Sequence, residues 1–139
     1  MSRIFLDTNI FVYTYDSGVP EKRDQATKLI ASLEGPSYMP VTSTQVLQEL
    51  YNILTRKIGF TPLNARTELL LLKEVQTIVV TPDIILAAAE LHASASISFW
   101  DALIVAAAQS AGCDELWTED MQAGRVFGNL KVVNPFTGR

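Results

Sequence analysis

The fold class is decided by the stretch Arg3-Ile4-Phe5-Leu6-Asp7-Thr8-Asn9, in which three apolar residues precede a carboxylate and two turn-forming polar residues. A short apolar run of this kind is typical of a buried strand, and the polar residues after it indicate a turn. In open α/β sheets, ligands bind beyond the carboxyl ends of the strands. Asp7 therefore marks the edge of the expected sheet at which a ligand would bind.

Outward from this strand, short apolar strands alternate with helices. The other strand patterns are Tyr38 to Val41, Thr77 to Val80, Glu115 to Thr118 and Leu130 to Val133. The helical patterns are Ile10 to Tyr15, Glu21 to Leu33, a helix capped by Thr42-Ser43-Thr44 that runs to Ile58, Asn64 to Gln76, Pro82 to His92 and Phe99 to Ser110. Strands that alternate with helices and lack a regular polar face are typical of a parallel sheet covered on both sides. The sequence predicts an α/β protein, a three-layer α/β/α sandwich with a short central parallel sheet.

The composition narrows the class of protein. The chain has 139 residues, of which 48% are apolar and 19% are charged. These values favour a single folded domain over residues 1–139 and exclude a disordered chain. The longest apolar run, Ala102 to Ala108, is too short to cross a membrane, which takes about 20 residues. The sequence shows no targeting segment, so we expect a cytoplasmic protein.

The charged and metal-binding residue types favour a site built from oxygen ligands. The net charge is −4, which argues against a broad basic surface for nucleic acid. The sequence has one cysteine, Cys113, and one histidine, His92, which excludes a thiolate or imidazole cluster and a disulfide within the chain. Carboxylates are the metal ligands that remain in quantity.

Four carboxylates fall where a ligand site is expected. Asp7 ends the first strand, Asp120 follows the strand that ends at Thr118, and Asp101 lies in the first turn of the apolar helix. Glu49 lies about 40° outside the apolar arc of its helix, on a border that can face the sheet edge. We therefore expect these four side chains to share one cleft.

Purely structural roles are the alternatives for these acids, and the sequence leaves them open. Ser98-Phe99-Trp100-Asp101 fits a helix-capping box, and Glu49 could be a solvated residue at the flank of its helix. If the four carboxylates do converge, their charges repel one another unless a cation is present. Mg²⁺ and Mn²⁺ prefer such oxygen ligands, and both ions activate water for phosphodiester hydrolysis.

Four segments along the chain carry a resemblance to a known family. They are Phe5-Leu6-Asp7-Thr8-Asn9, Val46-Leu47-Gln48-Glu49-Leu50, Ser98-Phe99-Trp100-Asp101-Ala102-Leu103-Ile104 and Leu116-Trp117-Thr118-Glu119-Asp120-Met121-Gln122-Ala123-Gly124. In content and order they resemble the PIN-domain ribonucleases and, within them, the VapC-type toxins of bacterial toxin–antitoxin pairs. The resemblance implies that Asp7, Glu49, Asp101 and Asp120 are the acidic quartet that binds Mg²⁺ or Mn²⁺.

The resemblance also implies further site residues and partners. The residues that would orient the ligands or a bound water are Thr8, Asn9, Thr118 and Ser43. Glu119 stands beside Asp120 as a spare acid, and the two could exchange roles. The implied partners are an RNA substrate, a cognate antitoxin protein and a second copy of the chain in a homodimer.

Three further features bear on RNA and protein partners. Arg56 follows Glu49 by seven residues on the same helix, so it could meet a neighbouring phosphate or remain a solvated arginine. Trp100 could stack on a base, although packing inside the protein is the favoured role. The run Leu69 to Leu72 covers about 300° of a helix, so one packed face cannot bury all four leucines. We expect a homodimer and an antitoxin groove to cover some of them, unless the domain itself buries that helix on two sides.

These observations predict a Mg²⁺- or Mn²⁺-dependent endoribonuclease that serves as the toxin of a toxin–antitoxin pair. One alternative is a housekeeping PIN-domain nuclease of RNA processing. Another is a non-catalytic binding module of PIN-like or receiver-like type. A receiver domain carries paired acids after its first strand, whereas here Asp7 is followed by Thr8-Asn9.

Overall fold

Residues 1–137, which the computed structural model describes, form a six-stranded sheet of order β3-β2-β1-β4-β6-β5. The strands are β1 (Ser2–Leu6), β2 (Tyr38–Ser43), β3 (Gln76–Ile78), β4 (Glu115–Trp117), β5 (Val126–Phe127) and β6 (Leu130–Val133). All neighbouring strands pair in parallel except β5, which pairs antiparallel with β6. The predicted central parallel sheet is confirmed, and the antiparallel edge strand β5 makes the sheet as a whole mixed.

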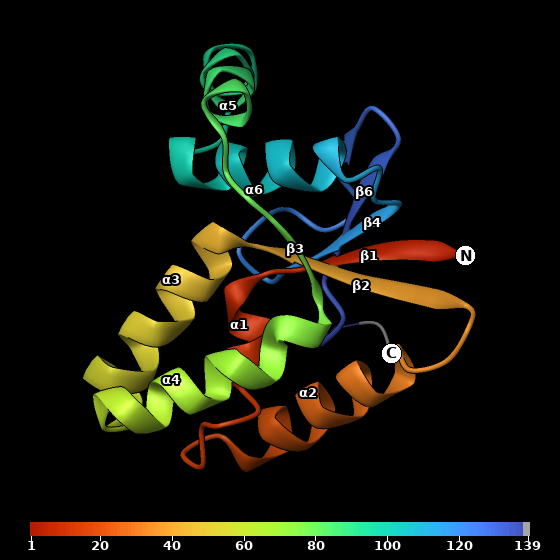
Figure 1. The fold of residues 1–139 in the computed structure, drawn as a ribbon. Helices are drawn as coiled ribbons and strands as arrows, with labels where there is room; N and C mark the ends of the chain where they lie inside the picture. Colours follow the sequence, from red (N-terminus) through yellow and green to blue (C-terminus); the bar gives the residue numbers. More distant parts are fainter. Residues whose placement is uncertain (138–139) are drawn as a thin grey trace.

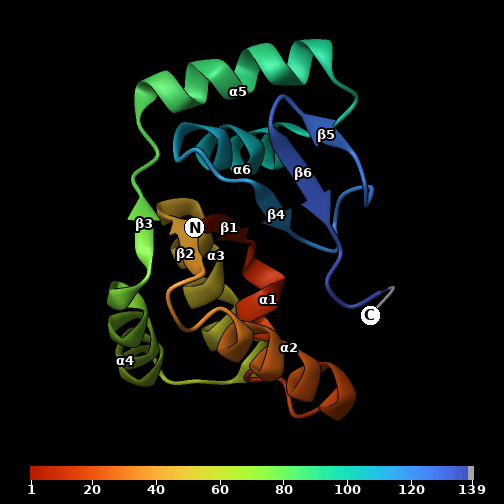
Figure 2. The same cartoon turned by 90° about the vertical axis from the view of Figure 1, so that its right-hand side faces the viewer.

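Helices cover both faces of the sheet. They are α1 (Thr8–Val12), α2 (Pro20–Ser32), α3 (Thr44–Ile53), α4 (Pro62–Leu71), α5 (Pro82–Ser94) and α6 (Phe99–Ser110). A π-helical turn, η1 (Leu54–Ile58), continues α3, and a 3-10 turn, η2 (Leu72–Glu74), follows α4. Figures 1 and 2 show α6 above the sheet with α5 outside it, and α1, α2 and α4 below. The predicted three-layer α/β/α arrangement is confirmed, with α5 as an additional outer helix.

The core lies around β1 and α6. β1 occupies the middle of the sheet between β2 and β4, and its residues Ile4, Phe5 and Leu6 are buried. In α6 every side chain from Ala102 to Ala108 is buried, because the helix lies between the sheet and α5. This burial explains why α6 carries no polar residue over two turns. No helix within residues 1–137 is long and apolar enough to span a membrane.

The boundaries of several elements differ from the predicted ones. The predicted helix over Asn64 to Gln76 is shorter, because α4 ends at Leu71 and β3 already begins at Gln76. The first helix begins at Thr8 rather than Ile10, because the Asp7 carboxylate caps it by accepting a hydrogen bond from the Thr8 amide. The hairpin of β5 and β6 was not predicted, since β5 has two residues and no usable periodicity.

Part of the leucine run faces solvent. Leu69 and Leu72 are half-buried against the core, whereas Leu70 and Leu71 are exposed. The alternative in which the domain buries the whole run is therefore wrong. That a second copy of the chain or an antitoxin covers the exposed leucines stays a prediction.

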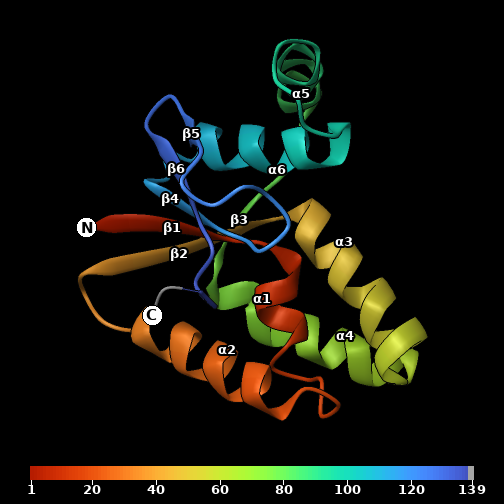
Figure 3. The ribbon, with the colours of Figure 1, turned by 180° about the vertical axis from the view of Figure 1, so that it is seen from behind.

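The C-terminal segment returns to the face of the sheet that α1 and α2 cover (Figure 3). After β6 the chain runs toward α2 and passes beside α1 (Figure 3). Phe136 of this segment meets the ring of Tyr13 edge-on, with 5.3 Å between ring centroids. This contact packs the segment after β6 against the residue that follows α1.

We expect Leu116→Ala to lower the free energy of unfolding by about 2–5 kcal/mol, because it opens a cavity in the centre of the sheet. Leu116 is 0% exposed, whereas Leu63 on α4 is 76% exposed. Leu63→Ala removes the same atoms and should change stability by less than about 0.5 kcal/mol. Urea unfolding of the two variants tests this, and equal losses would contradict the assigned core.

Candidate functional site

The register of the central strands brings Asp7 and Thr118 together. Leu6 pairs with Trp117, and the Asp7 amide donates to the Trp117 carbonyl at 3.1 Å, so the next residues of the two strands are neighbours. The Thr118 hydroxyl donates to Asp7 Oδ2 at 2.8 Å, and the Thr8 amide donates to Asp7 Oδ1 at 2.7 Å. Both carboxylate oxygens of Asp7 are thus held in place at the carboxyl edge of the sheet.

A cleft of about 250 Å³ opens at this edge, and all four predicted carboxylates line it. Its lining residues are Asp7, Thr8, Asn9, Gln45, Glu49, Ile53, Trp100, Asp101, Ile104 and Asp120. Asp7 is buried at the bottom, Asp101 is half-buried, and Glu49 and Asp120 are exposed. We call this space the acidic cleft. The structure brings the quartet together, and its role as metal ligands stays a prediction.

Two helices deliver Asp101 and Glu49 to the acidic cleft. Ser98 caps α6 by accepting a hydrogen bond from the Asp101 amide at 3.1 Å, so the capping role considered for this segment is real. The Asp101 carboxylate lines the cleft at the same time, so the two roles do not exclude each other. Glu49 extends from α3 and accepts a hydrogen bond from the Thr8 hydroxyl at 3.3 Å.

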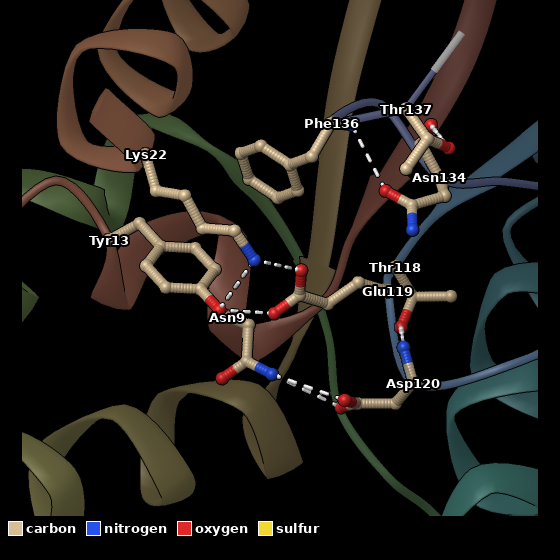
Figure 4. A network of polar contacts seen from close by, with 9 residues as sticks. All are labelled: Asn9, Tyr13, Lys22, Thr118, Glu119, Asp120, Asn134, Phe136 and Thr137. Carbon is tan, nitrogen blue, oxygen red and sulfur yellow. Dashed lines mark hydrogen bonds and ion pairs between the residues drawn. The ribbon is translucent and has the colours of Figure 1, made fainter. Parts of the chain in front are cut away.

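Asp120 is held by contacts with α1 and with its own turn. The side-chain amide of Asn9 donates to both carboxylate oxygens of Asp120 at 3.3 Å each, and the Asp120 amide donates to the Thr118 hydroxyl at 3.1 Å (Figure 4). Thr8 and Thr118 thus each contact two of the four acids and Asn9 contacts one, and their role in orienting metal ligands stays a prediction.

The remaining predicted residues lie outside the acidic cleft. Ser43 is buried and caps α3 by accepting a hydrogen bond from the Val46 amide at 3.4 Å, and it does not line the cleft. Glu119 forms an ion pair with Lys22 and does not line the cleft, so the considered exchange with Asp120 does not occur. Arg56 is exposed on η1. Its direction was predicted from regular α-helical spacing, and the wider π-helical turn changes the angle at which it leaves the helix.

Trp100 differs from its prediction. Its side chain is 66% exposed and lines the acidic cleft, with an edge-on contact to Phe99 at 5.4 Å between centroids. The favoured packing role is therefore wrong. The α6 helix buries its long apolar stretch after Asp101, while Trp100, one residue before it, points outward.

Burial raises the pKa values of all four acids, and repulsion by neighbouring carboxylates adds to the rise at Asp7, Glu49 and Asp120. Burial raises the pKa of Asp7 to about 6, the nearby charges of Asp120 and Asp101 add to the rise, and the hydrogen bonds from Thr8 and Thr118 oppose it. Burial is also the main cause of the raised pKa of Glu49, Asp101 and Asp120. Charge repulsion between the acids was expected from the sequence. In the structure, desolvation contributes more to the raised pKa values.

The chemistry of the cleft fits a hard divalent cation. Its polar lining offers carboxylate, hydroxyl and amide oxygens, and no thiol or imidazole is among them. Within residues 1–137, no three Asp, Glu, His or Cys side chains are arranged as a complete metal site. Mg²⁺ does not require one, because it usually keeps several waters and binds one or two protein carboxylates together with substrate phosphate. The donor set therefore suits Mg²⁺ or Mn²⁺ bound largely through water.

Sequence reasoning missed three residues around the cleft. Gln45 lines it, and its side-chain amide donates to the Trp100 carbonyl at 3.2 Å. Its position four residues before Glu49, on the same helix face, was a usable signal. Tyr13 and Lys22 bind Glu119, and no local pattern could indicate them because Lys22 and Glu119 are 97 residues apart.

Comparison with known proteins supports this description of the fold. Residues 4–127 match the sequence profile of the PIN domain. No match to a curated protein sequence was found. Among solved structures, the chain is similar to Mycobacterium tuberculosis VapC20, described as a toxin that cleaves the sarcin-ricin loop. The identity is 28%, the TM-score is 0.67, and the alignment covers 84% of this chain and 89% of that one.

Two further structures share the fold at lower identity. One is a toxin–antitoxin complex from Klebsiella pneumoniae, with 20% identity, a TM-score of 0.68 and coverage of 95% of this chain and 97% of that chain. The other is VapBC2 from Rickettsia felis bound to a promoter DNA fragment, with 20% identity, a TM-score of 0.65 and coverage of 94% and 96%.

The raised pKa of Asp7 makes stability depend on pH. Because its pKa is 3.8 in an ordinary environment and about 6 in the folded protein, the folded state binds more protons between these values. The free energy of unfolding should therefore fall as the pH rises through this interval. In a chelator, Asp7→Asn should raise that free energy by about 2 kcal/mol at pH 7.5 and have little effect near pH 4.

Urea unfolding across this pH range measures the effect. Asp24→Asn, which removes an exposed carboxylate from α2, should leave the profile of the wild-type protein unchanged. An Asp7→Asn variant that is no more stable than wild type at pH 7.5 would show that Asp7 carries no burial cost.

Proposed function

The chain belongs to the PIN domain family, and on this premise we propose that it is a Mg²⁺- or Mn²⁺-dependent endoribonuclease and the toxin of a toxin–antitoxin pair. The observation that carries the proposal is the convergence of Asp7, Glu49, Asp101 and Asp120 on one cleft at the carboxyl edge of the sheet. We also propose that residues 1–139 form one nuclease domain and act in the cytoplasm. The toxin role is supported by likeness to VapC20 at 28% identity.

The four carboxylates that line the cleft would hold the metal, directly or through bound water. When bound, the divalent ion would supply a water activated for attack and positive charge for the scissile phosphate. The hydrogen bonds from Thr8 and Thr118 fix the orientation of the Asp7 carboxylate before any ligand arrives. The pKa of Asp7 is raised to about 6 without a ligand, and a cation in the cleft would lower it because the positive charge favours the ionised carboxylate.

RNA as the substrate is supported by the surroundings of the cleft. Trp100 presents an exposed ring at the cleft wall, and such a ring can stack on an unpaired base whatever its identity. The net charge of −4 disfavours electrostatic attraction of RNA over a broad surface. The metal and the stacking ring would therefore provide the main attraction for the RNA. Arg56 is exposed and remains a candidate for a more distant phosphate.

The antitoxin is proposed to bind an apolar groove of about 710 Å³ beside α2 and η2. Its walls include Phe11, Ile30 and Leu72, and the carboxylates of Glu34 and Glu74 also line it. A segment with apolar residues next to a basic side chain would match this lining. Leu72 is the residue of the leucine run that would be covered in this way.

A second apolar surface is proposed to pair with another copy of the chain. Ile85 and Leu86 project from α5 and are exposed, and Val79 precedes the same helix. Figure 2 places α5 at the opposite end of the molecule from α4, so this surface is separate from the groove beside η2. Exposed apolar patches of this kind usually mark interfaces, and α5 has no polar function in the cleft.

The alternatives are less well supported. A housekeeping RNA-processing nuclease would use the same cleft, and the toxin is favoured because the similar solved structures are toxins or toxin–antitoxin complexes. A non-catalytic binding module would have no need of four carboxylates around one cleft. A receiver domain is disfavoured because Asn9 and Thr8, rather than a second acid, follow Asp7.

The activity is tested with purified protein and total RNA. We expect cleavage that depends on Mg²⁺ or Mn²⁺ and stops with a chelator. Asp7→Asn and Asp101→Asn should each lower the rate by more than about 100-fold, the upper range for loss of an outer contact to a metal ligand. Asp24→Asn should cut at the wild-type rate, and mapped cut sites would define the target. Equal rates for all variants would refute the assigned cleft.

The α5 surface is tested by two matched substitutions. Leu86 on α5 is 64% exposed and Leu71 on α4 is 65% exposed, so a charge at either position should cost the fold equally little. We expect wild type and Leu71→Glu to sediment as dimers at micromolar concentration and Leu86→Glu to sediment as a monomer. A dimer that survives Leu86→Glu would place the interface elsewhere.

A further inference from the structure

Each of the three residues 118 to 120 in the turn after β4 contacts different residues in the N-terminal part of the chain. Thr118 donates to Asp7, and Asp120 accepts from Asn9. Between them, Glu119 accepts hydrogen bonds from Lys22 Nζ at 2.7 Å and from the Tyr13 hydroxyl (Figure 4). The carboxylates of Glu119 and Asp120 therefore take different partners, although the residues are adjacent.

We propose that Lys22, Glu119 and Tyr13 act as a clamp that positions Asp120 for binding the divalent metal. None of the three lines the acidic cleft, so they are positioning residues and not ligands. The inference rests on the proposed function, because it gives Asp120 the role of a ligand. It assigns a use to Glu119, the acid that the quartet leaves out.

The clamp is a connected network and not an isolated surface ion pair. Lys22 Nζ also donates to the Tyr13 hydroxyl at 3.2 Å and lies 4.7 Å from the centroid of the Tyr13 ring. The Phe136 ring lies 5.4 Å from the same ammonium and packs edge-on against Tyr13. Each side chain is thus restrained by two others, which lowers the entropy lost on forming each contact.

The clamp holds both sides of the contact between Asn9 and Asp120. Asp120 is exposed, and its side chain is restrained by Asn9. Glu119 precedes Asp120 directly, so fixing its carboxylate fixes the backbone from which Asp120 projects. Tyr13 follows Asn9 by four residues, which places it one helical turn further along the same face. Loss of the clamp would free the Asp120 turn from α2 and leave the Asp120 side chain joined to α1 through Asn9.

The sign of the effect separates positioning from simple charge. Lys22 carries a positive charge near an acidic cleft, so its field alone weakens the binding of a cation. If Lys22 acted only through this field, its removal would strengthen metal binding. If the clamp positions Asp120, removal of Lys22 weakens metal binding despite the more negative cleft.

Isothermal titration of the full chain with Mn²⁺ tests the clamp. We expect Lys22→Met and Glu119→Gln each to raise the Kd about tenfold, as is usual when an outer contact of a metal ligand is lost. Lys22→Arg keeps the charge and a donor and should bind Mn²⁺ nearly as wild type does. Lys28→Met removes the same charge from an exposed position of α2 and is the matched control. Lys22 and Glu119 lie half-buried outside the core, so the variants should fold, which circular dichroism verifies.

The outcomes are distinct. Weaker binding in Lys22→Met but not in Lys28→Met supports the clamp. Binding by Lys22→Met that equals or exceeds that of wild type overturns it and leaves the proposed function standing. A wild-type protein that binds no Mn²⁺ overturns the proposed function and the clamp together.

Discussion

The parallel pairing of β1 with β2 on one side and β4 on the other is the constraint on which the site depends. It buries Ile4, Phe5 and Leu6 in the middle of the sheet and brings the ends of two strands to one edge. Asp7 stands at that edge, too deep in the protein to be solvated and too close to Thr118 to turn away. The same packing that stabilises the sheet therefore raises the pKa of Asp7 to about 6 and creates a position that favours a cation. Stability and ligand binding are opposed at this residue, because a buried carboxylate costs folding energy that a ligand can return.

Much of the fold followed from local patterns. The apolar strand that ends in Asp7, the alternation of strands and helices and the wholly apolar α6 are features that periodicity and burial can predict. The errors lie where tertiary structure decides the outcome. β5 has two residues and exists because β6 offers it a partner, and the end of α4 is set by the start of β3 at Gln76. Neither event leaves a periodic signal in the sequence.

The site was predictable to a similar degree and for similar reasons. Asp7 and Asp120 follow strands, so the geometry of parallel sheets indicates their meeting, and Ser98 marks the start of the helix that carries Asp101. What could not be predicted is which of two adjacent acids lines the cleft. Glu119 and Asp120 differ by one position, and only the folded chain shows that Lys22 and Tyr13 take the first away from the cleft. The exposure of Trp100 is of the same kind, since an apolar residue beside a buried helix is normally expected inside.

The long reach of the contact between Asp7 and Thr118, which are 111 residues apart, has a consequence for how the protein is made. Chains are synthesised from the N-terminus, and contacts between distant residues form late. A nascent chain on the ribosome carries Asp7, Glu49 and Asp101 but lacks the turn at residues 118 to 120 and the strand that completes the sheet around it. The acidic cleft is therefore incomplete until residues 118 to 120 and β6 have been synthesised, so the site is assembled well after Asp7, Glu49 and Asp101 have been made.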